Sequence, residues 1–432
     1  VMQPSWNNLS VHCLPCLRGY CLVLLWLIFA LLEASEPGSA LAKPSAGDDS
    51  RKCYNATHPD MAINYCTQAI ESGRLSGKAL GFVFYRRGNA YNEKRDYDRA
   101  IRDYDEASRL NPSHANAFSN RGVAYARKRD YARAIQNYDE AIRLNPNHAD
   151  AFSNRGVAYA RKGDYDRAIQ NYDEAIRLNP NHASALYDRG NAYRRKGDYD
   201  QAVQNYDQAI RLNPRHANAY SNRGIAYASK GDDDRAVQDY DQAIRLNPKH
   251  VNAFYNRGNA YRRMRDYDQA VQNYDQVIRL NPKHDSVYSS RGLVRFYQGQ
   301  FATAVPDLSH AVRFAPSNLY RILLLYLARA RAGSQAQDAL REATLGLNLE
   351  EWPGLVVSMY LGKLPEHVVL DAVAGADQAQ RRCQAYFYVG QQFLIRQNKS
   401  EAAKMFREAV AINASSLFEH EAAQAELNRL GN

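Results

Sequence analysis

Apolar residues follow a helical spacing in pairs of short segments separated by turns. In residues 149–182 the first segment ends near Gly163, and the second runs from Ala168 to Leu178. Apolar side chains at intervals of three and four residues predict two amphipathic helices. Gly163 suits the turn, Asp164 suits the N-cap of the second helix, and Pro180 ends that helix because proline lacks the amide hydrogen of the helical ladder. The pattern therefore predicts a helix-turn-helix unit.

This unit recurs at a constant interval of 34 residues from Gly81 to Asn318. Seven Arg-Gly pairs mark the interval, and a proline follows each pair 24 residues after its glycine. The glycines are Gly88, Gly122, Gly156, Gly190, Gly224, Gly258 and Gly292, and the prolines are Pro112, Pro146, Pro180, Pro214, Pro248, Pro282 and Pro316. One helix pair cannot bury its apolar face alone, so stacking of neighbouring pairs must supply the core. We therefore expect an all-α solenoid with seven units in residues 81–318.

The pattern within each unit matches a known repeat family at six positions. In residues 149–182 these positions hold Gly156, Tyr159, Ala168, Tyr172, Ala175 and Pro180. The array resembles tetratricopeptide repeats, and this resemblance implies a right-handed superhelix of helix pairs. The sixth unit departs from the pattern at Val277, and the seventh departs at Arg295 and Leu308. Pro306, within the second helix of the seventh unit, predicts a local distortion.

Helical caps are expected on both sides of the array. Residues 43–80 contain one helical stretch, at 61–72, which we expect to cap the N-terminal side. Residues 319–432 read as further helices, with a degenerate repeat at 383–416 and a final capping helix. Three stretches of this part, residues 352–362, 383–410 and 418–430, resemble the C-terminal part of NlpI-like bacterial periplasmic lipoproteins. Members of that family are adaptors for cell-wall hydrolases and a periplasmic protease, and the resemblance implies partners of these kinds.

The N-terminal 42 residues have the features of a signal peptide. Thirteen apolar or aromatic residues at 20–32 follow Arg18, and Ala40-Leu41-Ala42 has the small-x-small pattern of a cleavage site. A permanent membrane span needs roughly 20 apolar residues. We therefore expect export to the periplasm or beyond with cleavage after Ala42. The alternative is an uncleaved segment at 20–32 that anchors the chain in the inner membrane.

Cysteine usage agrees with export. Cys53 and Cys66 enclose a short loop, and in an oxidising compartment such a pair favours a disulfide. A loop of this size contributes about 3 kcal/mol in the chain-entropy model. Two free thiols are the alternative. Cys383 remains unpaired and is expected to be a buried small side chain.

The composition argues against several function classes. The net charge is +10, but Lys and Arg alternate with Asp and Glu throughout, which excludes a nucleic-acid footprint. Adjacent carboxylates such as Asp139-Glu140 point about 100° apart on a helix and are read as a solvated face. The histidines after the repeat prolines are expected to pack or cap loops, because their spacing is too wide for one metal ion. They are His114, His148, His182, His216, His250 and His284. We expect neither catalysis nor a cofactor.

The first helices of the units are expected to line a concave groove through positions two, five, six, nine, twelve and thirteen. Asparagine recurs there as Asn89, Asn116, Asn120, Asn154, Asn191, Asn218, Asn222, Asn252, Asn256 and Asn259. An amide both donates and accepts, so this ladder, which resembles that of O-linked N-acetylglucosamine transferase, could hold the backbone of an extended peptide. Alternatively these amides link neighbouring units. Tyr187 and Tyr255 add flat contact area.

Arginines make the predicted groove basic and favour acidic segments or a C-terminal carboxylate. They are Arg127, Arg161, Arg194, Arg195, Arg262 and Arg263. The arginine at position seven of every unit is instead expected to bridge neighbouring units. We expect a non-enzymatic adaptor of the bacterial cell envelope that captures extended protein segments. The alternative is an envelope assembly factor that binds peptidoglycan or another anionic polymer.

Overall fold

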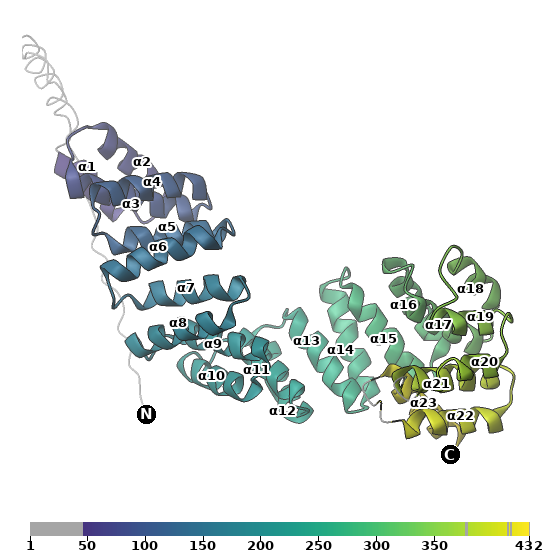
Figure 1. The fold of residues 1–432 in the computed structure, drawn as a ribbon. Helices are drawn as coiled ribbons and strands as arrows, with labels where there is room; N and C mark the ends of the chain where they lie inside the picture. The colour runs from purple at the N-terminus through teal and green to yellow at the C-terminus, as the bar shows by residue number, and fades with distance from the viewer. Residues whose placement is uncertain (1–45, 376–378, 413, 415–416, 432) are drawn as a thin grey trace, which may run out of the picture. The chain divides into compact units, whose positions relative to one another are not determined.

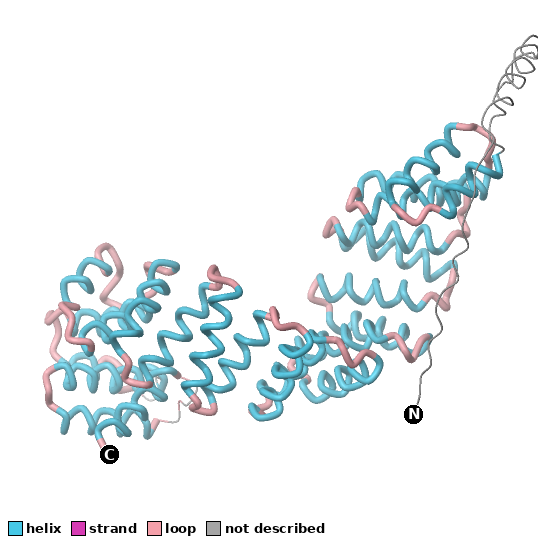
Figure 2. The backbone as a smooth tube through the Cα atoms, turned by 180° about the vertical axis from the view of Figure 1, so that it is seen from behind, coloured by secondary structure: helices cyan, strands magenta, loops and turns pink. Residues whose placement is uncertain are grey.

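A computed structural model describes residues 46–375, 379–412, 414 and 417–431 of the chain. Within these ranges every regular element is a helix (Figures 1 and 2). The predicted leader, with its apolar run at 20–32, lies outside the described residues. None of the described helices is long and apolar enough to cross a membrane. The chain divides into two compact units, one ending at Ser113 and one beginning at His114, and each is described by itself.

The first unit contains a capped helix pair. Its described helices are α1 (Ala46–Asn55), α2 (Pro59–Glu71), α3 (Gly77–Glu93) and α4 (Tyr97–Leu110). A disulfide joins Cys53 on α1 to Cys66 on α2, the pair that the short loop predicts. Helix α1 itself was not predicted, because its sequence, AGDDSRKCYN, is mostly polar and has no clear apolar period. Two helices, rather than one, therefore precede the first repeat.

The second unit continues with helix pairs that begin every 34 residues. They are α5 (Ala115–Arg127) and α6 (Tyr131–Leu144), α7 (Ala149–Arg161) and α8 (Tyr165–Leu178), α9 (Ala183–Lys196) and α10 (Tyr199–Leu212), α11 (Ala217–Ser229) and α12 (Asp233–Leu246), α13 (Val251–Arg263) and α14 (Tyr267–Leu280), and α15 (Asp285–Tyr297) and α16 (Phe301–Phe314). The predicted cap is present at Asp164, whose Oδ1 accepts the Arg167 amide hydrogen at 3.1 Å. Helix α16 runs without a break through Pro306, so the predicted distortion does not interrupt it.

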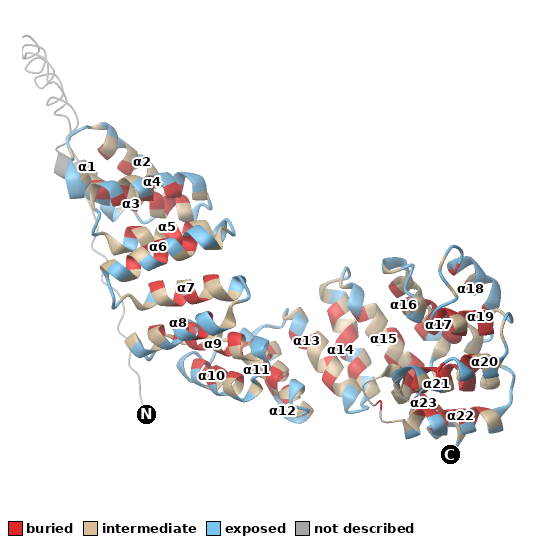
Figure 3. Ribbon diagram, in the orientation of Figure 1, coloured by how far each residue is buried: buried red, intermediate tan, exposed pale blue. Residues whose placement is uncertain are grey.

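On the second helices from α4 to α14, a buried tyrosine packs against a glycine on the first helix of the same pair. Tyr138 on α6 is 1% exposed, and a Cβ on Gly122 of α5 would lie 2.7 Å from its Cε1. The glycine is therefore needed for close approach of the two helices. The same contact recurs between Gly156 and Tyr172. Buried residues gather where helices face one another (Figure 3).

The arginine at position seven bridges neighbouring repeats, as predicted. Arg155 on α7 donates from Nε to Asn171 of its own repeat at 2.6 Å and from Nη1 to Asp139 of the preceding repeat at 2.5 Å. Arg189 repeats the arrangement with Asn205 and Asp173. Because each guanidinium is half-buried between two second helices, these bonds fix the register of the stack.

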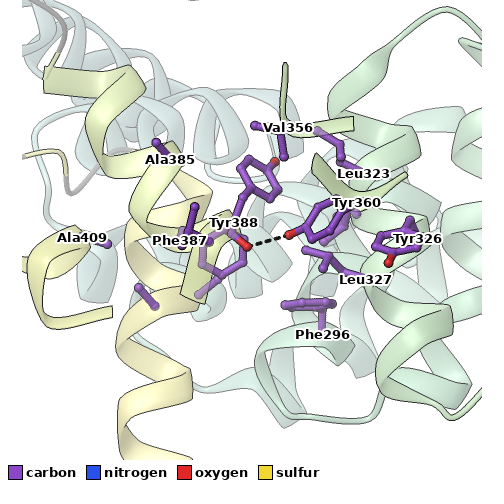
Figure 4. Packing of buried hydrophobic residues seen from close by; sticks show 14 of the residues in the cluster. Phe296, Leu323, Tyr326, Leu327, Val356, Tyr360, Ala385, Phe387, Tyr388 and Ala409 are labelled. Atoms are coloured by element: carbon purple, nitrogen blue, oxygen red, sulfur yellow. Dashed lines mark hydrogen bonds between the residues drawn. The ribbon is translucent and has the colours of Figure 1, made fainter. Parts of the chain in front are cut away.

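The C-terminal helices close over a larger apolar core. They are α17 (Leu319–Arg331), α18 (Gln337–Ala343), α19 (Gly354–Tyr360), α20 (Glu366–Asp371), α21 (Ala379–Ile395), α22 (Lys399–Ala411) and α23 (Phe418–Leu430). Tyr360 donates its hydroxyl hydrogen to the Tyr388 carbonyl at 2.8 Å within this core (Figure 4). Helices α21 and α22 form the expected degenerate pair, since Gly390 packs against the ring of Phe406. Cys383 is fully buried.

Candidate functional site

The first helix of each pair lies on one common face of the second unit. Helix α9 contacts both α7 and α11, and α13 contacts both α11 and α15. We call the surface lined by α5, α7, α9, α11, α13 and α15 the A-helix face. This is the face that the repeat pattern predicts to be concave. Positions two, five, six, nine, twelve and thirteen of each repeat are the ones expected to line it.

A hollow of about 530 Å³ opens on the A-helix face between α7, α9 and α11. The polar side chains that line it are Arg161, Asp188, Asn191, Arg194, Arg195 and Asn222. Its apolar lining includes Val157, Ala160 and Ala192. The structure thus brings together five of the predicted site residues from three successive repeats. A second hollow, of about 300 Å³, lies between α11 and α13 and includes Asn256, Asn259 and Arg263.

None of the three arginines of the first hollow forms a close ion pair with a carboxylate in the described part of the chain. Arg161 and Arg195 are exposed, and Arg194 is half-buried. The Nε hydrogen of Arg194 is buried without an acceptor. A buried donor without a partner costs free energy that a bound acceptor would recover. The hollow therefore presents positive charge and an unused hydrogen-bond donor. Arg127 does not line it.

Asp188 places one carboxyl among these arginines. Burial raises the pKa of Asp188 to about 6, although Asn191 and the charge of Arg161 act in the opposite direction. Asn191 donates to Asp188 Oδ1 at 3.4 Å. The carboxyl is therefore ionised above about pH 6, where it reduces the positive charge of the hollow, and neutral below it.

The asparagines at position nine have a role inside the repeats. The Oδ1 atoms of Asn89, Asn191 and Asn259 each accept the hydroxyl hydrogen of the buried tyrosine of their own repeat at 2.8 Å. In the repeats that carry Val or Ile at this position the tyrosine has no such partner. A buried hydroxyl is stabilised by an acceptor. These three amides therefore support the packing, which favours the alternative that the sequence analysis left open.

The other predicted asparagines differ in their hydrogen bonds within the chain and in their exposure. Asn222 donates to Tyr187 Oη at 3.0 Å and to Asn191 Oδ1 at 2.8 Å, so it links two repeats. Asn218 lies 3.0 Å from His250 Nε2. Asn116 and Asn252 are exposed, whereas Asn120, Asn154 and Asn256 are half-buried. The ladder is therefore not a uniform row of available amides.

Replacing Asn222 with alanine should lower the free energy of unfolding by about 1–2 kcal/mol, because two side-chain hydrogen bonds are lost. Asn154 is the matched control. It occupies the same position two repeats earlier and has no side-chain hydrogen bond in the described part of the chain. Its replacement with alanine should change the value by less than about 0.5 kcal/mol. Urea unfolding followed by circular dichroism would measure both, and equal losses would show that the bonds of Asn222 contribute nothing.

The two predicted aromatic residues are held by neighbouring side chains. The Tyr187 ring lies 4.6 Å from the His216 ring and accepts the Asn222 bond at its hydroxyl. The Tyr255 ring lies 4.9 Å from His284, and its hydroxyl lies 3.3 Å from Ser290 Oγ. Both side chains are half-buried, so only part of each side chain is available to a partner.

Two of the predicted groove arginines already hold carboxylates of this chain. Arg263 donates to Asp233 through Nε and Nη2, with a shortest distance of 2.5 Å. Arg262 on α13 donates from Nη1 to Glu421 Oε2 on α23 at 2.6 Å. Because their donors are occupied within the molecule, we do not include Arg262 and Arg263 in the candidate site.

Helix α23 lies on the C-terminal continuation of the A-helix face. Besides Arg262, it contacts α15 and α21, and its Glu426 accepts from Arg331 on α17 at 2.6 Å. Glu419 accepts from Gln384 and Tyr388 on α21, at 3.1 and 3.3 Å. These acidic residues cannot be predicted from the repeat pattern, because partners up to 159 positions apart leave no trace in a 34-residue period.

The described residues contain no group of His, Cys, Asp and Glu that could hold a metal ion. Four of the repeat histidines act as N-caps, as predicted, since their Nδ1 atoms accept a backbone amide hydrogen. They are His148, His182, His216 and His250.

Family models match an unbroken stretch of the chain. Models described as tetratricopeptide repeat match residues 85–149, 126–183, 171–204 and 251–284, and one described as TPR repeat matches 190–231 and 226–265. Residues 85–284 are tetratricopeptide repeats. The predicted helix-pair solenoid is confirmed. Tetratricopeptide repeats generally mediate protein–protein interaction, and their fold is typically a non-catalytic scaffold.

Several solved structures of repeat proteins are similar to the chain. A crystal structure of MamA is 29% identical over 38% of this chain and 95% of its own, with a TM-score of 0.35. YrrB, described as a TPR protein with an unusual peptide-binding site, is 26% identical over 44% of this chain and 95% of its own, with a TM-score of 0.37. The C-terminal part of a TPR repeat-containing protein from Cytophaga hutchinsonii is 21% identical over 57% and 97%, with a TM-score of 0.45.

Proposed function

We propose that this chain is a non-enzymatic adaptor that captures acidic protein segments in the hollow between α7, α9 and α11. The observation that supports the proposal is the set of three arginines, Arg161, Arg194 and Arg195, none of which forms a close ion pair with a carboxylate in the described structure. Guanidinium groups bind carboxylates through two parallel hydrogen bonds, which gives both affinity and geometry. The amides of Asn191 and Asn222 are engaged with each other, so the arginines rather than the asparagine ladder make the principal contacts.

The place of action proposed for the adaptor is the bacterial cell envelope. The support is the signal-peptide pattern of residues 1–42, together with the Cys53–Cys66 disulfide, which suits an oxidising compartment. The resemblance of the C-terminal part to NlpI-like lipoproteins adds cell-wall hydrolases and a periplasmic protease as candidate partners. Uncleaved, the segment at 20–32 would hold the same adaptor at the inner membrane.

The test uses a fluorescent octaglutamate peptide, with octaglutamine as its uncharged counterpart, and reads binding by anisotropy. Octaglutamate should bind more tightly, and the triple variant R161Q/R194Q/R195Q should lose about tenfold or more in affinity, since hydrogen bonds to charged groups contribute factors of that order. The matched control is R211Q/R215Q/R245Q, which removes the same charge from exposed arginines outside the hollow. Weak binding of both peptides, together with salt-sensitive pelleting with peptidoglycan, would instead support an envelope factor that binds an anionic polymer.

Binding of octaglutamate should strengthen as the pH falls from 7.5 to 5.5. Asp188 loses its negative charge over this range, because burial raises its pKa to about 6, whereas exposed glutamates of the peptide remain mostly ionised. A change of roughly threefold to tenfold is expected from removing one charge a few ångströms away. The variant D188N should bind at pH 7.5 as the parent does at pH 5.5. A pH effect that persists in D188N would assign the titration to another group.

A further inference from the structure

Helix α23 is an acidic helix held by two arginines of this chain, Arg262 on the A-helix face and Arg331 on α17. Glu421 pairs with Arg262 and Glu426 pairs with Arg331, each at 2.6 Å. Between these two glutamates the helix buries Ala422 and Ala423. The arginines of this chain therefore already bind carboxylates that belong to side chains of an α-helix.

The arginines of the hollow occupy the same repeat positions as the arginines that hold α23. Arg194 is the twelfth residue of its repeat, and so is Arg262 two repeats later. Arg195 is the thirteenth residue, and Arg331 is the thirteenth when the interval is continued through α17. Because the repeats stack in a constant register, arginines at these positions project from equivalent places on the A-helix face.

The two places differ in whether the arginine at position twelve is paired with a carboxylate. Arg262 is half-buried and donates to Glu421. Arg194 is equally half-buried, but its Nε hydrogen is buried without an acceptor. The hollow around Arg194 therefore has the donor arrangement of the α23 site, but no carboxylate is paired with Arg194.

The lining of the hollow also suits a helix. Small apolar side chains, Val157, Ala160 and Ala192, line the hollow beside its arginines. On α23 the buried alanines lie beside the glutamates, so a helix of this kind would place alanines against the apolar lining and a carboxylate against the arginines. Helix α23 has 13 residues and a length of about 20 Å, and with this length it makes contacts from α13 to α21. A partner helix of similar length can span the three A helices of the hollow.

We infer that the hollow between α7, α9 and α11 binds an acidic α-helix of a partner protein, with a glutamate or aspartate side chain seated on Arg194 and Arg195 as Glu421 is seated on Arg262. The inference rests on the proposed capture of acidic segments and specifies their conformation. It departs from the extended segment that the asparagine ladder suggested.

The experiment compares two peptides of identical charge on the full chain. One is a 13-residue peptide of the α23 sequence with blocked ends and a hydrocarbon staple replacing Gln424 and Asn428, which holds it helical. The other is unstapled and carries A423P, which prevents the helix. Circular dichroism verifies both conformations. The stapled peptide should bind at least tenfold more tightly by fluorescence anisotropy. The variant R194Q/R195Q should weaken this binding about tenfold, and R211Q/R215Q, with the same loss of charge, should leave it unchanged.

Three outcomes would overturn the inference. Equal or tighter binding of the proline peptide would mean that the hollow takes an extended segment, and the proposed function would stand. Binding that is unaffected by R194Q/R195Q but lost in R262Q would mean that the peptide replaces α23 instead of filling the hollow. Failure of both peptides and of octaglutamate would remove the proposed function together with the inference.

Discussion

Replacing Tyr138 with alanine should lower the free energy of unfolding by about 3–5 kcal/mol, the range for deletion of a buried aromatic ring. The ring is 1% exposed and fills the space that Gly122 leaves open between α5 and α6. It also packs with Ala134 of its own helix and Ala158 of the next repeat. The variant therefore opens a cavity at a junction of two repeats, which the close-packed helices cannot fill without moving apart.

Urea unfolding followed by far-ultraviolet circular dichroism would measure this loss. The control is Q136A, which truncates an exposed side chain on the same helix and should change stability by less than about 0.5 kcal/mol. A second variant, Y138L, should lose less than Y138A, because Leu308 occupies the equivalent place against Gly292 in the last repeat. Equal stability of Y138A and Q136A would show that the tyrosine is not a principal element of the core.

The repeat interval was sufficient to predict the helix pairs, because each relevant contact lies within one unit or between neighbours. Asp164 caps α8 and Gly156 receives Tyr172 as their positions in the period require. The bridge from Arg155 to Asp139 was also predictable, since the arginine recurs in all seven units and the aspartate in the first six, with the same spacing. Local chemistry repeated at a constant interval leaves few alternatives for the fold.

The same interval could not show which groove residues remain available. Asn154 and Asn222 occupy the same repeat position, yet only Asn222 donates to a tyrosine hydroxyl and an amide oxygen of the preceding repeat. The repeat before Asn154 has Ser119 and Val123 at the positions of Tyr187 and Asn191. Arg194 and Arg262 are likewise equivalent by position, and only Arg262 meets Glu421. These differences arise from the non-repeating residues and from the C-terminal helix, whose place on the A-helix face is set by packing over long sequence distances.

Replacing Glu419 with glutamine should remove a loss of stability that the protein otherwise suffers as the pH rises from about 4.5 to 7. The Glu419 side chain is buried and accepts hydrogen bonds from neutral groups, namely its own backbone amide and the side chains of Gln384 and Tyr388. Burial raises its pKa to about 7, even though these bonds act in the opposite direction. In the unfolded chain the carboxyl ionises near pH 4.5, so between these values the unfolded state releases a proton that the folded state retains. Folding is then opposed increasingly up to about pH 7 and no further above it.

The difference in unfolding free energy between E419Q and the parent should therefore shift by about 3 kcal/mol in favour of E419Q between pH 4.5 and pH 8. Trp352 donates to Gln384 in the same network at 2.8 Å, so its fluorescence during urea unfolding reports on this region. The contrasting control is E426Q. Although burial alone would raise the pKa of Glu426, the bonds and charges of Arg429 and Arg331 hold it below its usual value. E426Q should therefore be destabilised at pH 8, because it leaves two half-buried guanidinium groups without their carboxylate. Glu419 and Glu426 lie two turns apart on one helix, and opposite signs for their glutamine variants at pH 8 would show that the surrounding charges, rather than burial, decide whether a carboxylate stabilises the bound α23. The same sign for both would contradict this account.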